Sequence, residues 1–318
     1  MPRCLDSLLH QDISWEEYEI ILVNDGSPDN SLEIAEDYST NYPNIRVYSQ
    51  ENKGTSGARN SGLINARGKY VYFVDPDDYV LENSLRVILD KMEEESLDVL
   101  RFGYIEVNEQ YAPTKSCKHP ENPDYSSKVM DGFSFMQERL GTACYVWTFL
   151  FRTALIKDNN LYFDDNAYID DTPWLPQVLA VANRVDSIDL KRHFYLIRSG
   201  SLVRANGEKG KEKQIAAQRW LIRELCRQKE FVDNKKGILW YKRMISHCVV
   251  SFLSLVGSYD YQNRFYYISF LRKQSVLPLF FGREPIRTKT KKMIINVSPE
   301  AYCSIIHTFA KKNAHDSN

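Results

Sequence analysis

The stretch YVYFVDPDDYV (70–80) runs from an apolar β-strand pattern directly into three carboxylates. Asp75, Asp77 and Asp78 lie close together along the chain, and like charges at that spacing repel one another unless a cation or water surrounds them. Two interpretations follow. Either the aspartates form a turn and a helix cap, or they provide oxygen ligands for a divalent cation.

Outward from this stretch, short apolar runs alternate with helical patterns from Tyr18 to about Leu100. Strands are predicted at 18–24, 44–50, 70–74 and 97–107, and helices at 31–42, 55–66 and 84–95. This alternation indicates a layered α/β domain with a largely parallel central sheet. Ligands of such sheets bind beyond the carboxyl ends of the strands, which is where Asp25 and Asp75 are expected.

The composition is that of an ordinary globular protein. The 318 residues are 43% hydrophobic and 26% charged. No apolar run reaches the roughly 18 residues that a membrane span needs, and the start MPRCLDSLLHQD lacks the apolar core of a signal peptide. The six cysteines have no metal-ligand spacing. We therefore expect a cytoplasmic protein with free thiols.

The net charge of −1 conceals a strong asymmetry. Residues 205–318 contain 21 Lys+Arg and 9 Asp+Glu, whereas residues 1–204 contain 20 and 33. A basic region of this kind can bind an anionic membrane surface, a phosphorylated acceptor or nucleic acid, or it can dock on the acidic part of the chain. No nucleic-acid-binding motif is recognisable, so we expect no nucleic-acid partner.

Two glycine-containing stretches precede the acidic one. In VNDGSPDNS (23–31), Asp25 ends a strand and Gly26 allows a sharp turn, a pattern that is usually structural alone. NKGTSGARNSGL (52–63) offers flexible backbone and cations, but its glycines lack the spacing of a phosphate-binding loop. The chain also contains no GxGxxG. These observations argue against P-loop triphosphatases and dinucleotide-binding enzymes.

Taken in order and spacing, VNDGSPDNS, NKGTSGARNSGL and YVYFVDPDDYV resemble the motifs of family 2 glycosyltransferases, inverting enzymes with the GT-A nucleotide-sugar fold. The resemblance implies that Asp25 contacts the base of the nucleotide and that Arg59 lies near the nucleotide. It also places Asp75, Pro76 and Asp77 on the DxD motif. Because residues i and i+2 of a strand point to the same side, Asp75 and Asp77 would share one Mg²⁺ or Mn²⁺.

The resemblance continues to about residue 204. In place of the family's Glu-Asp pair the chain has Asp170-Asp171, and because the second carboxylate of that pair is the general base, Asp171 is implied as the catalytic residue. Asp171 could instead cap the following helix. YLIRSGSLVR (195–204) resembles the family's closing segment, which makes Arg198 a candidate for binding the phosphates of the nucleotide sugar, with a structural ion pair as the alternative.

Three regions are expected: a nucleotide-sugar-binding half at 1–107, an acceptor-side half at 108–204, and a basic helical region at 205–318 outside the resemblance. Family members begin with an apolar strand that this chain lacks, because PRCLDSLLHQ (2–11) corresponds to the helix after it. Either the true start lies upstream of Met1, or the gene is truncated and its product is weak or inactive.

The expected function is transfer of a sugar, with inversion, from a nucleotide-diphosphate sugar to a hydroxyl group. The donor would be a UDP-sugar by family habit, and the acceptor a glycan or a lipid-linked oligosaccharide used in cell-surface polysaccharide synthesis. The basic region would then contact the inner face of the cell membrane. Two alternatives are a catalytically inactive nucleotide-sugar-binding remnant and a nucleotidyltransferase, although the Gly-rich signature that the latter needs near the N-terminus is missing.

Overall fold

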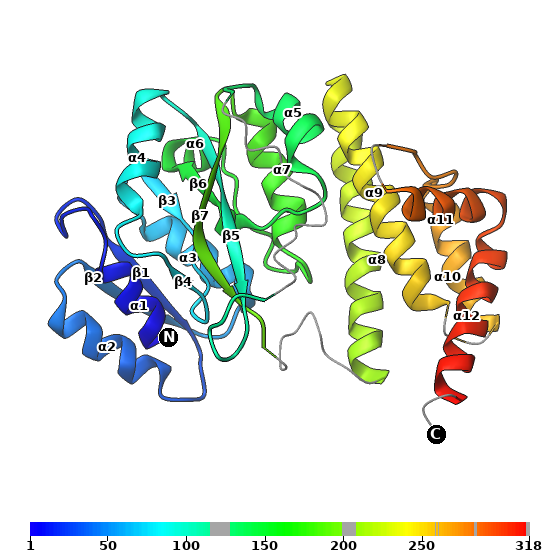
Figure 1. Ribbon diagram of the computed structural model, residues 1–318, viewed down its shortest axis with the longest axis horizontal. Helices are drawn as coiled ribbons and strands as arrows, with labels where there is room; N and C mark the ends of the chain where they lie inside the picture. Colours follow the sequence, from blue (N-terminus) through cyan, green and yellow to red (C-terminus); the bar gives the residue numbers. More distant parts are fainter. Residues whose placement is uncertain (115–127, 199–207, 258, 260, 283–284, 316–318) are drawn as a thin grey trace. The chain divides into compact units, whose positions relative to one another are not determined.

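The structure is a computed structural model that describes residues 1–114, 128–198, 208–257, 259, 261–282 and 285–315. The chain forms two compact units, Met1–Ser201 and Leu202–Asn318, which are described separately below (Figure 1). The boundary predicted between residues 204 and 205 lies outside the described residues. Within the described ranges, no helix is both long and apolar enough to cross a membrane.

The first unit carries the strands, which alternate with short helices. The strands are β1 (Ile20–Asp25), β2 (Ile45–Gln50), β3 (Tyr70–Tyr72), β4 (Tyr79–Val80), β5 (Val99–Val107), β6 (Phe149–Arg152) and β7 (Val185–Leu196). The helices are α1 (Pro2–Leu9), α2 (Ser31–Asn41), α3 (Gly54–Asn65), α4 (Leu85–Glu94), α5 (Gly132–Phe135), α6 (Thr153–Asp158) and α7 (Asp171–Val181), with a π-helical turn η1 (Met136–Leu140) and a 3₁₀ turn η2 (Val146–Thr148). The predicted α/β class and its alternation along the first 107 residues are confirmed.

The strands form two sheets with mixed directions. β1 and β2 make a parallel pair of their own, and the other sheet has the order β3-β6-β5-β7-β4. In that second sheet only β5 and β7 are parallel, whereas β3–β6, β5–β6 and β4–β7 are antiparallel. The expectation of a largely parallel sheet was therefore wrong for this part. Periodicity identifies which segments are strands, but strand direction depends on which end of the sheet each connection reaches.

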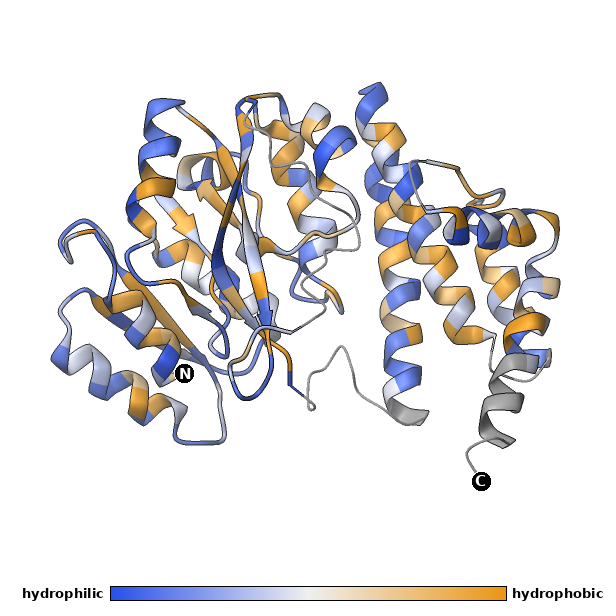
Figure 2. Cartoon of the chain, viewed as in Figure 1, coloured by the Kyte–Doolittle hydropathy of each residue, from blue (hydrophilic) through white to orange (hydrophobic). Residues whose placement is uncertain are grey.

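The two faces of the five-stranded sheet are covered by different helices. Side chains of β5 alternate between the faces, so Leu100 and Phe102 pack with Ile88 and Met92 of α4. The opposite face carries Phe149 and Phe151 of β6, which contact aromatic rings from α5 and α7. Figure 1 shows α4 on one side of the sheet and α5 and α7 on the other, and Figure 2 shows apolar residues on the strands between them, interrupted by hydrophilic ones on β7.

An aromatic cluster ties the end of β3 to α7. Phe73 follows β3 directly and meets Phe163 and Trp174 edge-on, with ring centroids 5.5 and 5.7 Å apart. Trp174 of α7 stacks on Phe163 at 4.2 Å. Such pairs add roughly 0.5 to 1.5 kcal/mol beyond the area they bury. The cluster therefore fixes the acidic stretch after Phe73 relative to the start of α7.

The second unit is helical. It consists of α8 (Glu208–Glu230), α9 (Lys235–Val256), α10 (Tyr261–Lys273), α11 (Ile286–Val297) and α12 (Pro299–His315). Helix α9 packs against α8, α10 and α12, and α11 packs against α12. Buried side chains of α9 such as Trp240, Met244 and Phe252 form much of its core. The helical character predicted for this region is confirmed.

Four of the described cysteines agree with the expectation of free thiols. Cys4, Cys226, Cys248 and Cys303 are buried free cysteines, and Cys144 is buried as well. Cys117 lies outside the described residues.

Gly132, the first residue of α5, offers a test of how α5 and α7 pack. A Cβ atom at this position would lie 1.7 Å from the carbonyl oxygen of Leu179, and the Gly132 N–H donates to Ala182 O at 3.0 Å, so the backbone cannot move away freely. We expect Gly132→Ala to lower the free energy of unfolding by about 1 to 3 kcal/mol or more, measured by thermal unfolding.

A matched control is Gly62→Ala in α3. There the nearest atom to a new Cβ is Val23 Cγ2 at 4.0 Å, and alanine in a helix is favoured over glycine by about 1 kcal/mol. This variant should be as stable as the native chain or more stable. Equal unfolding midpoints for the two variants would contradict the packing described here.

Candidate active site

The acidic stretch forms a turn beyond the end of β3. The strand ends at Tyr72, and the N–H of Asp78 donates to the carbonyl oxygen of Asp75 at 3.0 Å. The extended geometry expected for Asp75 and Asp77 is therefore not found, because the chain turns before it reaches them. Their carboxylates instead pair with two different arginines, Arg59 for Asp75 and Arg198 for Asp77.

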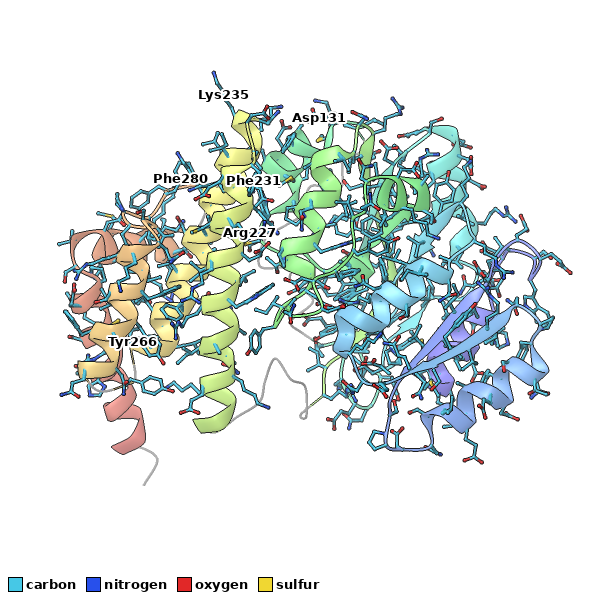
Figure 3. The ribbon with its side chains drawn as sticks, turned by 180° about the vertical axis from the view of Figure 1, so that it is seen from behind. Asp131, Arg227, Phe231, Lys235, Tyr266 and Phe280 are labelled. Atoms are coloured by element: carbon cyan, nitrogen blue, oxygen red, sulfur yellow. The ribbon has the colours of Figure 1, made fainter. Side chains whose placement is uncertain are left out.

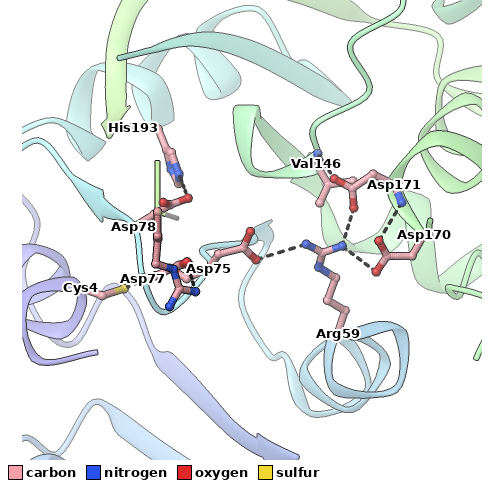
Figure 4. Close-up of polar contacts among 10 residues, drawn as sticks. Cys4, Arg59, Asp75, Asp77, Asp78, Val146, Asp170, Asp171 and His193 are labelled. Atoms are coloured by element: carbon pink, nitrogen blue, oxygen red, sulfur yellow. Dashed lines mark hydrogen bonds and ion pairs between the residues drawn. The ribbon is translucent and has the colours of Figure 1, made fainter. Parts of the chain in front are cut away.

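Arg59 of α3 is the centre of the polar network (Figure 4). Its guanidinium lies 3.2 Å from Asp75 and 2.8 Å from Asp170, and it also forms a hydrogen-bonded ion pair with Asp171. Only 10% of the Arg59 side chain is exposed. Although burial alone would lower the pKa of Arg59, the three carboxylates raise it. Three predicted site residues, Arg59, Asp75 and Asp171, are thus brought together.

Asp170 and Asp171, at the start of α7, make different hydrogen bonds. Asp170 is the N-cap, and its carboxylate accepts a hydrogen bond from the Asp171 N–H at 3.0 Å. Asp171 is the first helical residue, and its carboxylate accepts from Arg59 and, at 3.2 Å, from the N–H of Val146. The alternative that Asp171 caps the helix is therefore wrong. Its carboxylate is left facing the network rather than its own helix.

Burial and neighbouring charges set the protonation of Asp171. Burial raises its pKa, Arg59 lowers it, and the carboxylates of Asp170 and Asp75 raise it again, to about 7. A carboxyl group with a pKa near neutral can accept a proton and release it under physiological conditions. Groups shifted in this way by burial and specific partners are common at catalytic sites.

Asp78 lies in the turn, and its carboxylate points into the protein. It contacts His193 Nε2 at 2.9 Å and accepts from the Leu196 N–H at 2.8 Å, and the other ring nitrogen of His193 lies 2.7 Å from the Tyr72 hydroxyl. His193 and Asp78 are 0% and 1% exposed. Burial raises the pKa of Asp78, while His193 and the Leu196 N–H oppose that rise. This buried chain fastens the turn to β7.

Asp78 does not cap the next helix. Helix α4 begins at Leu85 after Ser84, and the Leu85 and Arg86 N–H groups donate to the carboxylate of Asp12. Asp12 could not be identified as the partner from a sequence pattern, since it lies more than 70 residues away. His193 was missed for the same reason, because its partner Asp78 lies 115 residues away in the chain.

Arg198 and Asp77 form an ion pair at the open side of the turn. The side chains are 54% and 28% exposed, so this pair contributes little to stability. The structural ion pair considered for Arg198 is therefore present. Binding of phosphate by Arg198 remains a prediction.

Asp25 lies at the end of β1, where Gly26 makes the predicted sharp turn with φ of +68°. Its carboxylate accepts hydrogen bonds from Gln50 Nε2 at 2.7 Å and from the Lys53 N–H at 2.8 Å. Lys53 directly precedes α3, the helix that carries Arg59. Asp25 thus fixes the start of that helix, and its contact with a nucleotide base remains a prediction.

The acidic turn has the chemistry for a hard divalent cation. Asp75 and Asp77 provide carboxylate oxygens, the ligands that Mg²⁺ and Mn²⁺ prefer, and their side chains are 34% and 28% exposed, so water can reach them. No group of three or more His, Cys, Asp or Glu side chains suited to a metal occurs in the described part of the chain. Water and substrate phosphates would have to complete the coordination.

Comparison with known proteins identifies the family of this site. The model of glycosyl transferase family 2 matches residues 1–156, which include Arg59 and the acidic turn. This region, just under half of the chain, matches glycosyl transferase family 2. The resemblance seen in the three motifs is therefore confirmed.

Several curated family relatives share about a third of their aligned residues with this chain. EpsJ of Bacillus subtilis strain 168, an uncharacterized glycosyltransferase, is 35% identical over 209 residues, which cover 64% of this chain and 58% of EpsJ. The poly(ribitol-phosphate) β-N-acetylglucosaminyltransferase TarS of Staphylococcus aureus strain Mu50 is 32% identical over 200 residues, covering 61% of this chain and 33% of TarS. The chain thus spans less than two thirds of either relative.

A solved structure shows the same fold. The crystal structure of S. aureus TarS 1-349 in complex with UDP matches with a TM-score of 0.67 at 20% identity, covering 100% of this chain and 88% of that one. The predicted nucleotide-sugar fold with a helical C-terminal region is therefore confirmed.

The pKa of Asp171 predicts how stability depends on pH. The folded protein keeps a proton on Asp171 up to about pH 7, whereas the unfolded chain releases it near 3.8. Between these values the folded state binds more protons, so the free energy of unfolding falls as the pH rises. We expect Asp171→Asn to remove this loss and to be more stable than the native chain by about 2 to 4 kcal/mol above pH 7, with no difference below about pH 4.

Thermal unfolding across this pH range measures the effect. Asp158→Asn is the control, because Asp158 is exposed on α6. A constant difference between Asp171→Asn and the native chain at every pH would show that the carboxyl group titrates normally.

Replacing His193 should destabilise the protein, because the buried carboxylate of Asp78 contacts its ring. In His193→Phe the Asp78 carboxylate loses its side-chain partner, and breaking a buried pair costs about 3 to 5 kcal/mol of stability. Tyr72→Phe removes only one hydrogen bond and should cost about 1 kcal/mol. Urea unfolding of both variants compares their losses in free energy of unfolding. Equal losses would mean that the Asp78–His193 pair contributes no more than the single hydrogen bond of Tyr72.

Proposed function

We propose that this chain is an inverting glycosyltransferase that moves a sugar from a nucleotide-diphosphate sugar to a hydroxyl group. The observation that carries the proposal is the Asp171 carboxylate. Only 17% of its side chain is exposed, its pKa is raised to about 7, and it is joined through the single guanidinium of Arg59 to Asp75 of the acidic turn. The proton acceptor Asp171 is thus separated by one side chain, Arg59, from the acidic turn whose carboxylates could bind the cation of the donor.

The reaction needs one displacement. Asp171 accepts the proton of the acceptor hydroxyl, and the oxygen attacks the anomeric carbon on the face opposite the diphosphate. The new C–O bond forms as the bond to the diphosphate oxygen breaks, so the configuration inverts and the proton remains on Asp171. Arg59 and the Val146 N–H hold the carboxylate in place and favour its ionised form before the reaction.

The acidic turn is the proposed binding site for the donor. Asp75 and Asp77 would hold Mg²⁺ or Mn²⁺, and this cation would stabilise the charge that grows on the diphosphate leaving group. We assign the base of the nucleotide to Asp25 and the phosphates to Arg59 and Arg198. The complex of TarS with UDP supports a UDP-sugar as the donor.

The acceptor is assigned by chemical class. We propose a hydroxyl group of a glycan or of a lipid-linked oligosaccharide used in building cell-surface polysaccharides. The name of TarS, which acts on poly(ribitol-phosphate), supports an acceptor of this class.

Donor binding and turnover test the proposal separately. Unfolding midpoints measured with Mn²⁺ and UDP, GDP, dTDP or CMP should rise with one nucleotide, since ligand at about 100 times its Kd adds about 2.7 kcal/mol. Release of UDP from UDP-glucose or UDP-N-acetylglucosamine, with water as the acceptor, then measures turnover without a known acceptor.

Asp171→Asn should lower this turnover by about 10²- to 10⁴-fold while keeping the nucleotide-induced shift, with Asp158→Asn unchanged. Native turnover should fall as the pH drops below about 7, because Asp171 becomes protonated. Nucleotide binding without turnover in the native chain would favour the inactive nucleotide-sugar-binding alternative, and no shift with any nucleotide would overturn the donor assignment.

A further inference from the structure

Helix α11 presents an apolar stripe to solvent. Ile286, Met293 and Val297 are 82%, 60% and 88% exposed. At 100° per residue, Met293 and Val297 each lie about 20° from Ile286 around the helix, on either side of it, so the three side chains share one face. Helices of globular proteins normally turn such a face toward the core. Here it is the outward face.

The opposite face of α11 is firmly attached to the preceding segment. Lys292 is buried and its Nζ donates to the carbonyl oxygen of Phe280 at 2.8 Å. Asn296 exchanges two hydrogen bonds with the backbone of Leu279, at 2.5 and 3.1 Å, and Ile295 is fully buried. Figure 3 labels Phe280 in this segment. Because these contacts fix the rotation of the helix, the stripe cannot turn inward.

Cations flank the stripe. Helix α11 carries Arg287, Lys289 and Lys291 besides the buried Lys292, and no Asp or Glu. At 100° per residue, Lys289 lies about 60° to one side of Ile286 and Arg287 about 100° to the other, and both are exposed. Figure 2 shows apolar and strongly polar residues side by side along this helix.

We propose that α11 binds to the surface of an anionic membrane, with Ile286, Met293 and Val297 among the lipid headgroups and the flanking cations on lipid phosphates. Interfacial helices combine an apolar face with Lys and Arg in this way, and anionic lipids strengthen their binding. A second copy of the chain would bring the same cations against one another and be repelled. The proposal does not depend on the transferase activity.

Flotation of the full chain with lipid vesicles tests the proposal. The native chain should bind phosphatidylcholine vesicles that contain about 30% phosphatidylglycerol, more weakly as salt is added, and should not bind phosphatidylcholine alone. Met293→Ser combined with Val297→Ser should abolish binding. Replacing Arg287 and Lys289 by Gln should weaken it about fivefold for each cation removed.

Two controls separate this surface from the rest of the chain. Ile64→Ser removes an apolar side chain that is 62% exposed on α3, and it should bind vesicles like the native chain. Asp171→Asn should bind them too, because membrane contact is independent of the proposed catalysis. Unchanged unfolding midpoints show that the α11 variants are folded.

Three outcomes would overturn the proposal. One is a native chain that floats with neither vesicle. Another is binding that survives both the serine and the glutamine variants. The third is a dimer of the native chain, seen by sedimentation, that the serine variants dissociate, since the stripe would then be an interface between copies.

Discussion

One guanidinium holding three carboxylates is the interaction on which the first unit depends. Arg59 joins Asp75, which lies 16 residues away, to Asp170 and Asp171, which lie 111 and 112 residues away. Three like charges brought this close together would otherwise repel each other. The planar fork of arginine has enough donors to serve all three, so α3, the acidic turn and α7 meet at a single residue.

Apolar packing next to this network fixes the positions of its polar side chains. Phe73, Phe163 and Trp174 hold the chain just before the acidic turn against the first turns of α7. On the other side of the turn, Trp147 stacks on the ring of His193 at 4.6 Å. Polar groups whose supports are packed on both sides keep their positions to within a fraction of an ångström, which proton transfer requires.

Much of this arrangement was predictable, and the limits have physical causes. Local periodicity located the strands and helices up to Val107, and the ordered motifs singled out Arg59, Asp75 and Asp171. The ion pair between Arg59 and Asp171, the burial of Asp78 on His193 and the directions of β3 and β6 were not predictable. Each depends on contacts between segments far apart in the chain. A sequence pattern shows the type of each residue, but not which distant residues it contacts in the fold.

The thiol of Cys4 lies against the acidic turn and has a consequence for redox chemistry. Its Sγ is 3.7 Å from the carbonyl oxygen of Asp75 (Figure 4), and burial raises the pKa of Cys4 to about 12. At neutral pH about one molecule in 10⁵ would carry the thiolate, the form that peroxides and alkylating reagents attack. Oxidants that inactivate enzymes through exposed cysteines would therefore leave this turn intact.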